Sequence, residues 1–145
     1  MLYNHVVLLL GTNVGDKKKN IENAHVALYS VGLLIENHTI VLENQPVEFT
    51  SENLFFNQII EAKTSLSPIE LLKKIKKIEQ DMGRKYAKPL DGEIYTDRLI
   101  DIDILYYNRI NYVSKDLVIP HPRAFTRKFV LDLLSVSYTH LTLPT

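Results

Sequence analysis

The segment from Arg98 to Tyr106 constrains the fold more than any other part of the chain, because it places two carboxylates inside an apolar run. Side chains of a strand alternate between the two faces of a sheet, so Asp101 and Asp103 should point the same way. Two carboxylates this close disfavour each other's charge unless a cation lies between them, and a divalent metal with oxygen ligands is the usual solution. The pattern predicts a magnesium site on a buried strand. The alternative is a pair of acids that face solvent or that pair with Arg98 and other bases.

Length and composition restrict the class of protein. The chain has 145 residues, which suits one domain with its own hydrophobic core. Its formal net charge is zero, so its overall charge recruits neither nucleic acid nor an anionic membrane. It has no cysteine, which excludes disulfides, thiolate catalysis and cysteine-ligated zinc. The apolar run at residues 6–10 is too short to span a bilayer, and we expect a cytoplasmic protein.

Apolar periodicity divides the first half of the chain into strands and a helix. An apolar run over residues 5–10 predicts a strand that is buried on both faces. Apolar residues then recur at helical spacing after Asp16, which can cap a helix that Gly32 would end. Residues 33–42 and 54–63 look like strands, and we expect them to pair antiparallel.

The second half continues the same alternation. The capping box Ser67-Pro68-Ile69-Glu70 begins a helix that is expected to end at Gly83, and residues 84–97 read as a long loop before the strand with the two acids. The order strand, helix, strand, strand, helix, strand predicts an α+β fold, a ferredoxin-like βαββαβ sheet with helices on one face. We also expect a small hairpin near Asn108-Arg109 and a last helix from about Arg123.

The C-terminal segment differs from the rest of the chain in composition. Residues 135–145 contain no Asp, Glu, Lys or Arg, although 23% of the chain is charged. We therefore expect residues 1–134 to form the domain and residues 135–145 to be an unrelated tail joined to it. An ordinary strand-like terminus is the alternative.

Two further segments bear on phosphate chemistry. The segment from Gly11 to Lys17 lies between a strand and a helix, but it fails the P-loop pattern, and a tight turn with a helix cap is favoured. The second segment contains Pro120-His121-Pro122-Arg123 and Arg127-Lys128, and further bases are found at Arg84, Lys85, Lys88 and Arg98. Cations gathered about two acids suit polyphosphate transfer, although surface charge is the alternative for any one of them.

Four segments together resemble one enzyme family. They are Gly11 to Asp16, the helix end Glu79…Gly83-Arg84, Arg98-x-x-Asp101-x-Asp103, and residues 120–131. In this order they are similar to the 6-hydroxymethyl-7,8-dihydropterin pyrophosphokinases of folate biosynthesis, over about residues 1–134. The resemblance implies a ferredoxin-like α+β enzyme that transfers the terminal diphosphate of ATP to the hydroxymethyl group of a reduced pterin and releases AMP.

The resemblance also implies roles for individual residues. Asp101 and Asp103 would hold two magnesium ions (Mg2+) that bridge the phosphates of the co-substrate ATP. Arg84 and Arg98 match the family's mobile catalytic arginines, at the two ends of a loop that closes as a lid. The positions that match ATP contacts are Glu79, Arg84, Arg98, His121 and Arg127. Those that match pterin contacts are the ring pair Phe55 and Phe129, the amide Asn57, Asp101, and backbone near Asn44 to Val47.

The chain departs from the family pattern at three places. Tyr95-Thr96-Asp97 stands where Trp-Gly-Pro is common, residues 42–46 lack the usual tyrosine and threonine, and the family's continuation after residue 134 is absent.

We expect a monomer whose partners are ATP and a reduced pterin, with no nucleic acid and no membrane. The non-enzymatic alternative is a ferredoxin-like nucleotide- or RNA-binding module. It is disfavoured if a central strand carries Asp101 and Asp103, which would repel a phosphate backbone. A D-x-D glycosyltransferase would need a sugar-nucleotide domain for which the chain has no room.

Overall fold

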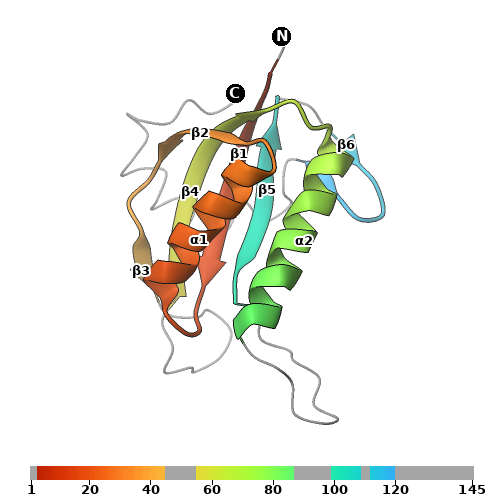
Figure 1. Ribbon diagram of the computed structural model, residues 1–145. Helices are drawn as coiled ribbons and strands as arrows, with labels where there is room; N and C mark the ends of the chain where they lie inside the picture. The colour runs from red at the N-terminus through yellow and green to blue at the C-terminus, as the bar shows by residue number, and fades with distance from the viewer. Residues whose placement is uncertain (1–2, 45–54, 87–98, 109–111, 120–145) are drawn as a thin grey trace.

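The computed structural model of the chain describes residues 3–44, 55–86, 99–108 and 112–119, which form a sheet with two helices packed on one of its faces (Figure 1). The elements are, in order, β1 (Asn4–Thr12), α1 (Lys17–Ser30), β2 (Leu34–His38), β3 (Leu42–Asn44), β4 (Phe55–Thr64), α2 (Pro68–Tyr86), β5 (Asp101–Tyr107), β6 (Tyr112–Val113) and β7 (Val118–Ile119).

All neighbouring strands of the sheet are antiparallel. The main sheet has the order β2-β4-β1-β5, with β3 also paired to β4, whereas β6 and β7 form a separate two-stranded sheet. This is the ferredoxin-like topology that the order of elements predicts. β1 and β4 are the central strands and β5 lies at one end of the order, so the expectation that a central strand carries the two acids is wrong.

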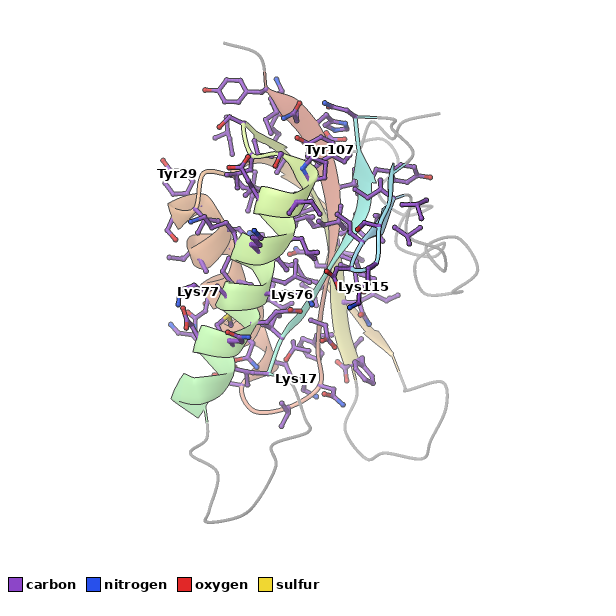
Figure 2. The ribbon with its side chains drawn as sticks, turned by 90° about the vertical axis from the view of Figure 1, so that its right-hand side faces the viewer. Lys17, Tyr29, Lys76, Lys77, Tyr107 and Lys115 are labelled. Carbon is purple, nitrogen blue, oxygen red and sulfur yellow. The ribbon has the colours of Figure 1, made fainter. Side chains whose placement is uncertain are left out.

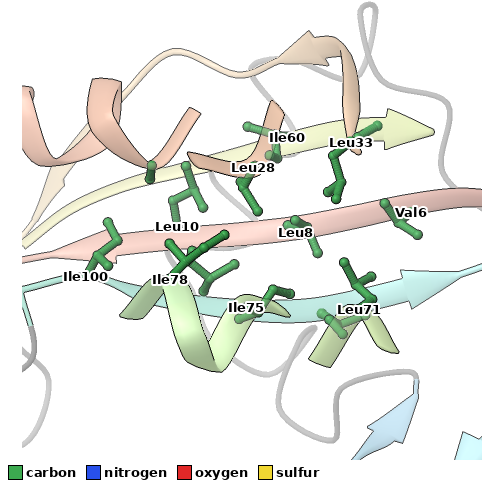
Figure 3. Packing of buried hydrophobic residues seen from close by; sticks show 14 of the residues in the cluster. Val6, Leu8, Leu10, Leu28, Leu33, Ile60, Leu71, Ile75, Ile78 and Ile100 are labelled. Carbon is green, nitrogen blue, oxygen red and sulfur yellow. The ribbon is translucent and has the colours of Figure 1, made fainter. Parts of the chain in front are cut away.

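The hydrophobic core lies between the sheet and the helices. Val6, Leu8 and Leu10 of β1 pack against Leu28 of α1 and Ile75 of α2, and all five side chains are buried (Figure 3). Seen edge-on, the helices form one layer and the strands the other (Figure 2). Val7 and Leu9, which alternate with them on β1, are buried as well, as the continuous apolar run predicts for a strand that is buried on both faces.

Local capping explains where both helices begin. The side chain of Asp16 accepts a hydrogen bond from the backbone N–H of Lys19 at 3.1 Å, which satisfies one of the free donors at the start of α1. At α2, the hydroxyl of Ser67 accepts from the N–H of Glu70 and the carboxylate of Glu70 accepts from the N–H of Ser67, both at 3.2 Å. Both predicted helix starts are confirmed.

The end of α2 and the extent of β2 differ from the prediction. α2 continues past Gly83 to Tyr86, because a glycine ends a helix only where it adopts a positive φ, and Gly83 is not among the positive-φ residues. The strand predicted over residues 33–42 is two strands separated at Thr39. There the Thr39 hydroxyl accepts from the N–H of Ile59 at 3.0 Å and donates to the carbonyl of Ile40 at 2.8 Å, so a side chain replaces part of the backbone ladder.

The hairpin after β5 lies a few residues beyond its predicted position. Asn108, with a φ of 51°, ends β5, and the two strands of the hairpin, β6 and β7, follow it. The predicted last helix and the tail lie outside the residues that the structure describes. No helix within the described ranges is long and apolar enough to cross a membrane.

Candidate active site

Three strands place Asn57, Gly11 and Asp101 in one row across the sheet. Gly11 of β1 is the register partner of both Asn57 on β4 and Asp101 on β5. Side chains that lie opposite each other in neighbouring strands point to the same face, so the amide and the carboxylate flank a position without a side chain. A Cβ at Gly11 would lie 3.0 Å from Oδ1 of Asn57, which means that the buried amide occupies this space.

Asp101 and Asp103 share the face of the sheet opposite the helices. Ile102 and Ile104, which alternate with them, belong to the core under the helices, while both aspartates are half-buried. Asp103 lies across from Leu9 of β1, next to the row of Asn57, Gly11 and Asp101. The period of two that the sequence suggested therefore does place both carboxylates on one face.

Glu79 of α2 binds the backbone of β5 at the residue that separates Asp101 from Asp103. Its Oε2 accepts a hydrogen bond from the backbone N–H of Ile102 at 2.9 Å. Because β5 lies at the end of the sheet order, this carboxylate ties the acid-bearing strand to the helix layer. Glu79 thus has a positioning contact at the predicted site in addition to the ATP contact that the resemblance implies.

A buried polar network supports the same end of the sheet. The hydroxyl of Thr12 donates to the carbonyl of Leu99 at 2.6 Å, and the amide of Asn20 donates to Oγ1 of Thr12 at 3.1 Å and to the carbonyl of Val14 at 2.8 Å. These bonds fix the turn after β1 against the residues that lead into β5. The sequence analysis does not predict this network. The feature that could have indicated it is the presence of two polar residues, Thr12 and Asn20, on otherwise apolar faces.

The remaining predicted residues are only partly described. Phe55 is half-buried, lies two residues before Asn57 on β4, and so shares its face; its register partner on β3 is Asn44. The backbone of Arg84 lies in the last turn of α2, not in a loop as predicted. The predicted site residues that lie outside the described ranges are Val47, Arg98, His121, Arg127 and Phe129.

The opposite end of this face carries polar contacts that join strands. Glu61 of β4 is buried; its carboxylate lies 3.1 Å from Nε2 of His5 and accepts from the amide of Asn37 at 2.9 Å. Burial raises the pKa of the Tyr106 hydroxyl, which keeps that phenol neutral. We assign these groups to the packing of β1, β2, β4 and β5.

The carboxylates of Asp101 and Asp103 suit a magnesium ion that also binds the phosphate groups of a ligand. Within the described ranges, no three acidic or imidazole side chains lie close enough together to hold a metal by themselves. Magnesium is usually held by one or two carboxylates and completes its coordination with water and substrate phosphates. Two half-buried carboxylates on one strand match this mode of binding.

Comparisons with known proteins identify the family of the chain. The model of the 7,8-dihydro-6-hydroxymethylpterin-pyrophosphokinase family matches residues 7–137. The chain is 38% identical over 129 residues to the folate synthesis bifunctional protein of Arabidopsis thaliana, a match that covers 89% of this chain and 26% of that protein. It is 33% identical over 133 residues to the 2-amino-4-hydroxy-6-hydroxymethyldihydropteridine pyrophosphokinase of Bacillus subtilis, which covers 91% of this chain and 77% of that protein.

Solved structures show the same fold. The crystal structure of wild-type Plasmodium falciparum HPPK-DHPS with pteroate aligns with a TM-score of 0.68 at 18% identity, covering 93% of this chain and 39% of that one. The chain spans 26%, 22% and 25% of the length of three plant relatives that it matches, so it corresponds to one segment of those proteins. Because the family model covers most of its length, the chain belongs to the 7,8-dihydro-6-hydroxymethylpterin-pyrophosphokinase family.

Proposed function

We propose that this chain transfers the terminal diphosphate of ATP to the hydroxymethyl group of 6-hydroxymethyl-7,8-dihydropterin and releases AMP. The observation that carries the proposal is the row of Asn57, Gly11 and Asp101, with Asp103 beside it on the same face. This row brings an amide that can read a heterocycle next to carboxylates that can hold a metal. Membership of the family supports the class of reaction.

Asp101 and Asp103 would hold two magnesium ions. When bound, these ions would reduce the negative charge of the ATP phosphates, which repels an incoming oxygen. The contribution of the chain is to keep two carboxylates on one face of a strand that Glu79 fixes in place.

Asn57, Phe55 and Phe129 would bind the pterin. A buried amide supplies both a donor and an acceptor for the polar edge of the ring, and its environment allows little movement because it rests against Gly11. Phe55 extends from the same face of β4 and would stack on one side of the ring, with Phe129 on the other. Backbone at Asn44 and Val47 would complete this side of the site, and Asp101 would lie at the boundary between pterin and metal.

The reaction would need positioning more than acid–base catalysis. The hydroxymethyl oxygen forms a bond to the β-phosphorus and gives up its proton to solvent, and the bond from that phosphorus to the oxygen that bridges it to the α-phosphorus breaks, so AMP leaves. Arg84 and Arg98 would stabilise the charge on the transferred phosphates as catalytic residues. Glu79, His121 and Arg127 would contact ATP.

A nucleic-acid-binding role has less support from the sheet. A ferredoxin-like module that stacks bases needs exposed aromatic side chains on its central strands. Here the face of the central strand β1 away from the helices carries Val7 and Leu9, which are 0% and 5% exposed, and the same face of the other central strand, β4, carries a single aromatic side chain, that of the half-buried Phe55. Function as a monomer in the cytoplasm stays a prediction.

The test is the release of AMP from ATP and magnesium by the purified chain, with and without 6-hydroxymethyl-7,8-dihydropterin. We expect AMP only when the pterin is present. 6-Methyl-7,8-dihydropterin, which lacks the attacking hydroxyl group, should support no release and serves as the matched control. Release of ADP in place of AMP, or AMP formation that does not depend on the hydroxyl group, would contradict the proposed reaction.

A further inference from the structure

A buried hydroxyl and a buried amide lie behind the end of the sheet that carries the acids. Thr12 is the last residue of β1 and Asn20 lies near the start of α1, and they are 1% and 6% exposed. Thr12 follows Leu10 by two residues and so shares its face, which packs under the helices. Asp101 and Asp103 face the other side of the sheet. Thr12 and Asn20 can therefore influence that site only through the backbone.

The direction of each hydrogen bond in this pair is fixed. The amide nitrogen of Asn20 donates to the carbonyl oxygen of Val14 at 2.8 Å, and because that oxygen can only accept, the orientation of the amide is set. The same nitrogen donates its other hydrogen to Oγ1 of Thr12 at 3.1 Å. The Thr12 hydroxyl accepts from the amide and so directs its own hydrogen to the carbonyl oxygen of Leu99, at 2.6 Å.

The bond to Leu99 begins where the backbone pairing of β5 ends. In the described sheet, β5 pairs with β1 alone, and the last register pair of that ladder is Gly11 with Asp101. The end of β1 and the start of β5 lie at the same end of the sheet (Figure 1). The terminal pair of a ladder opens more readily than its interior. The Thr12 hydroxyl extends the connection between the strands past this pair, to a residue two positions before Asp101.

A second side chain holds β5 on the other side of Asp101. Oε2 of Glu79 accepts from the backbone N–H of Ile102 at 2.9 Å. Asp101 therefore lies between two backbone groups that side chains of other elements bind, the carbonyl of Leu99 and the N–H of Ile102. Residues that orient the ligands of a metal typically contribute about 10–100-fold to its affinity.

We propose that Thr12 and Asn20 are positioning residues for the magnesium ligand Asp101. The inference rests on the proposed function, because it takes Asp101 as a ligand of the metal that diphosphate transfer requires. Thr12 keeps the start of β5 against β1, and Asn20 directs the hydroxyl that does so.

The experiment measures how much magnesium strengthens the binding of α,β-methylene-ATP to the full chain. In this analogue a methylene group replaces the oxygen between the α- and β-phosphorus, so it cannot release AMP and the measurement does not depend on turnover. Calorimetry gives the dissociation constant without magnesium and at saturating magnesium, and the ratio of the two is the magnesium effect.

Thr12→Val removes the hydroxyl and keeps the shape of the side chain. We expect it to reduce the magnesium effect about tenfold, the lower end of the range for residues that orient a ligand, because Thr12 acts through the backbone. Thr12→Ser, which retains the hydroxyl, should show a magnesium effect close to that of the wild type. Asn20→Ala should reduce it by a smaller factor, because the hydroxyl remains but loses its fixed direction, and it decides the question if Thr12→Val does not fold.

Thr39→Val is the matched control for the loss of a buried hydroxyl. Thr39 is also 1% exposed, and its hydroxyl also bonds to backbone, at the carbonyl of Ile40 and the N–H of Ile59. These bonds do not involve β5. Thr39→Val should therefore lower the free energy of unfolding by a similar amount and leave the magnesium effect unchanged.

The outcomes separate this inference from the proposed function. A wild-type magnesium effect in folded Thr12→Val, equal losses in Thr12→Val and Thr39→Val, or no recovery in Thr12→Ser would overturn the positioning role. If the variants behave as expected but the wild-type chain releases no AMP in the presence of the pterin, diphosphate transfer is refuted and the positioning role stands.

Discussion

Replacing Gly11 with alanine adds one methyl group at the point where β1 passes the amide of Asn57. The new Cβ would lie 3.0 Å from Oδ1 of Asn57, which is tighter than ordinary van der Waals contact. Asn57 is 4% exposed, so its side chain has little space in which to move away. The substitution therefore tests the close approach on which the candidate site depends.

Two opposing terms set the expected magnitude. Overpacking a buried position costs about 1–3 kcal/mol. Replacing glycine with alanine in a conformation that alanine can adopt gains about 0.4–1 kcal/mol, through the lower entropy of the unfolded chain. The difference predicts a net loss of about 0.5–2 kcal/mol in the free energy of unfolding, measured by urea denaturation. Displacement of Asn57 should also weaken pterin binding, by about tenfold for a loss of about 1.4 kcal/mol.

Two controls test whether the contact with Asn57 causes this cost: alanine at another glycine, and Gly11→Ala in a variant that lacks the Asn57 amide. Gly83→Ala adds a methyl group to the interior of α2, where no atom of the described residues lies within 4 Å, and should stabilise the chain by about 0.5–1 kcal/mol. In an Asn57→Ser background, most of the cost of Gly11→Ala should disappear, because the clashing oxygen has been removed. If Gly11→Ala costs the same in both backgrounds, the contact with Asn57 does not explain the glycine.

Three other substitutions and a deletion test separate parts of the account. Arg84→Ala and Arg98→Ala should each lower turnover much more than they weaken pterin binding, and equal losses in both, measured by steady-state kinetics and calorimetry, would assign these arginines to ground-state binding. Hydrogen bonds from the side chain and backbone of Ser67 hold the pKa of the Glu70 carboxyl below its usual value of 4.5. The carboxylate therefore contributes its stabilisation at pH values above 4.5 and loses it as the pH falls through the lowered pKa. Glu70→Gln should therefore make the free energy of unfolding, measured by urea denaturation, less dependent on pH below 4.5. An unchanged pH dependence would show that the Glu70 carboxylate does not cap the helix. Deleting residues 135–145 should leave ATP binding by the folded protein intact, and a large loss of affinity would assign that segment to the site.

Elements that depend on local chemistry could be predicted from the sequence. The Asp16 cap and the Ser67 capping box involve residues three apart in sequence, so their partners are visible in the chain itself. The shared face of Asp101 and Asp103 follows from the alternation of a strand and needs no knowledge of its neighbours. These features were predicted because the forces that fix them act within one element.

Features that depend on register between distant strands could not be predicted. The sequence predicts a turn that starts at Gly11, whereas the place of Gly11 between Asn57 and Asp101 follows only from pairings across 46 and 90 positions of sequence. The partnership of His25 with Gln58 likewise needs the crossing of α1 over β4. The sequence predicts a helix end at Gly83, where α2 in fact continues, because a sequence does not show which φ a glycine adopts.

The central claim, that the two acids of β5 hold the metal for diphosphate transfer, is tested most directly by the magnesium dependence of AMP release in three variants. Asp101→Asn and Asp103→Asn keep the size and polarity of each side chain but remove its charge, while Asp116→Asn changes an exposed aspartate between β6 and β7 as the control. We predict that the first two variants lose most of their pterin-dependent AMP release even at saturating magnesium, and that Asp116→Asn retains wild-type activity. Wild-type release and an unchanged magnesium dependence in both Asp101→Asn and Asp103→Asn would contradict the claim.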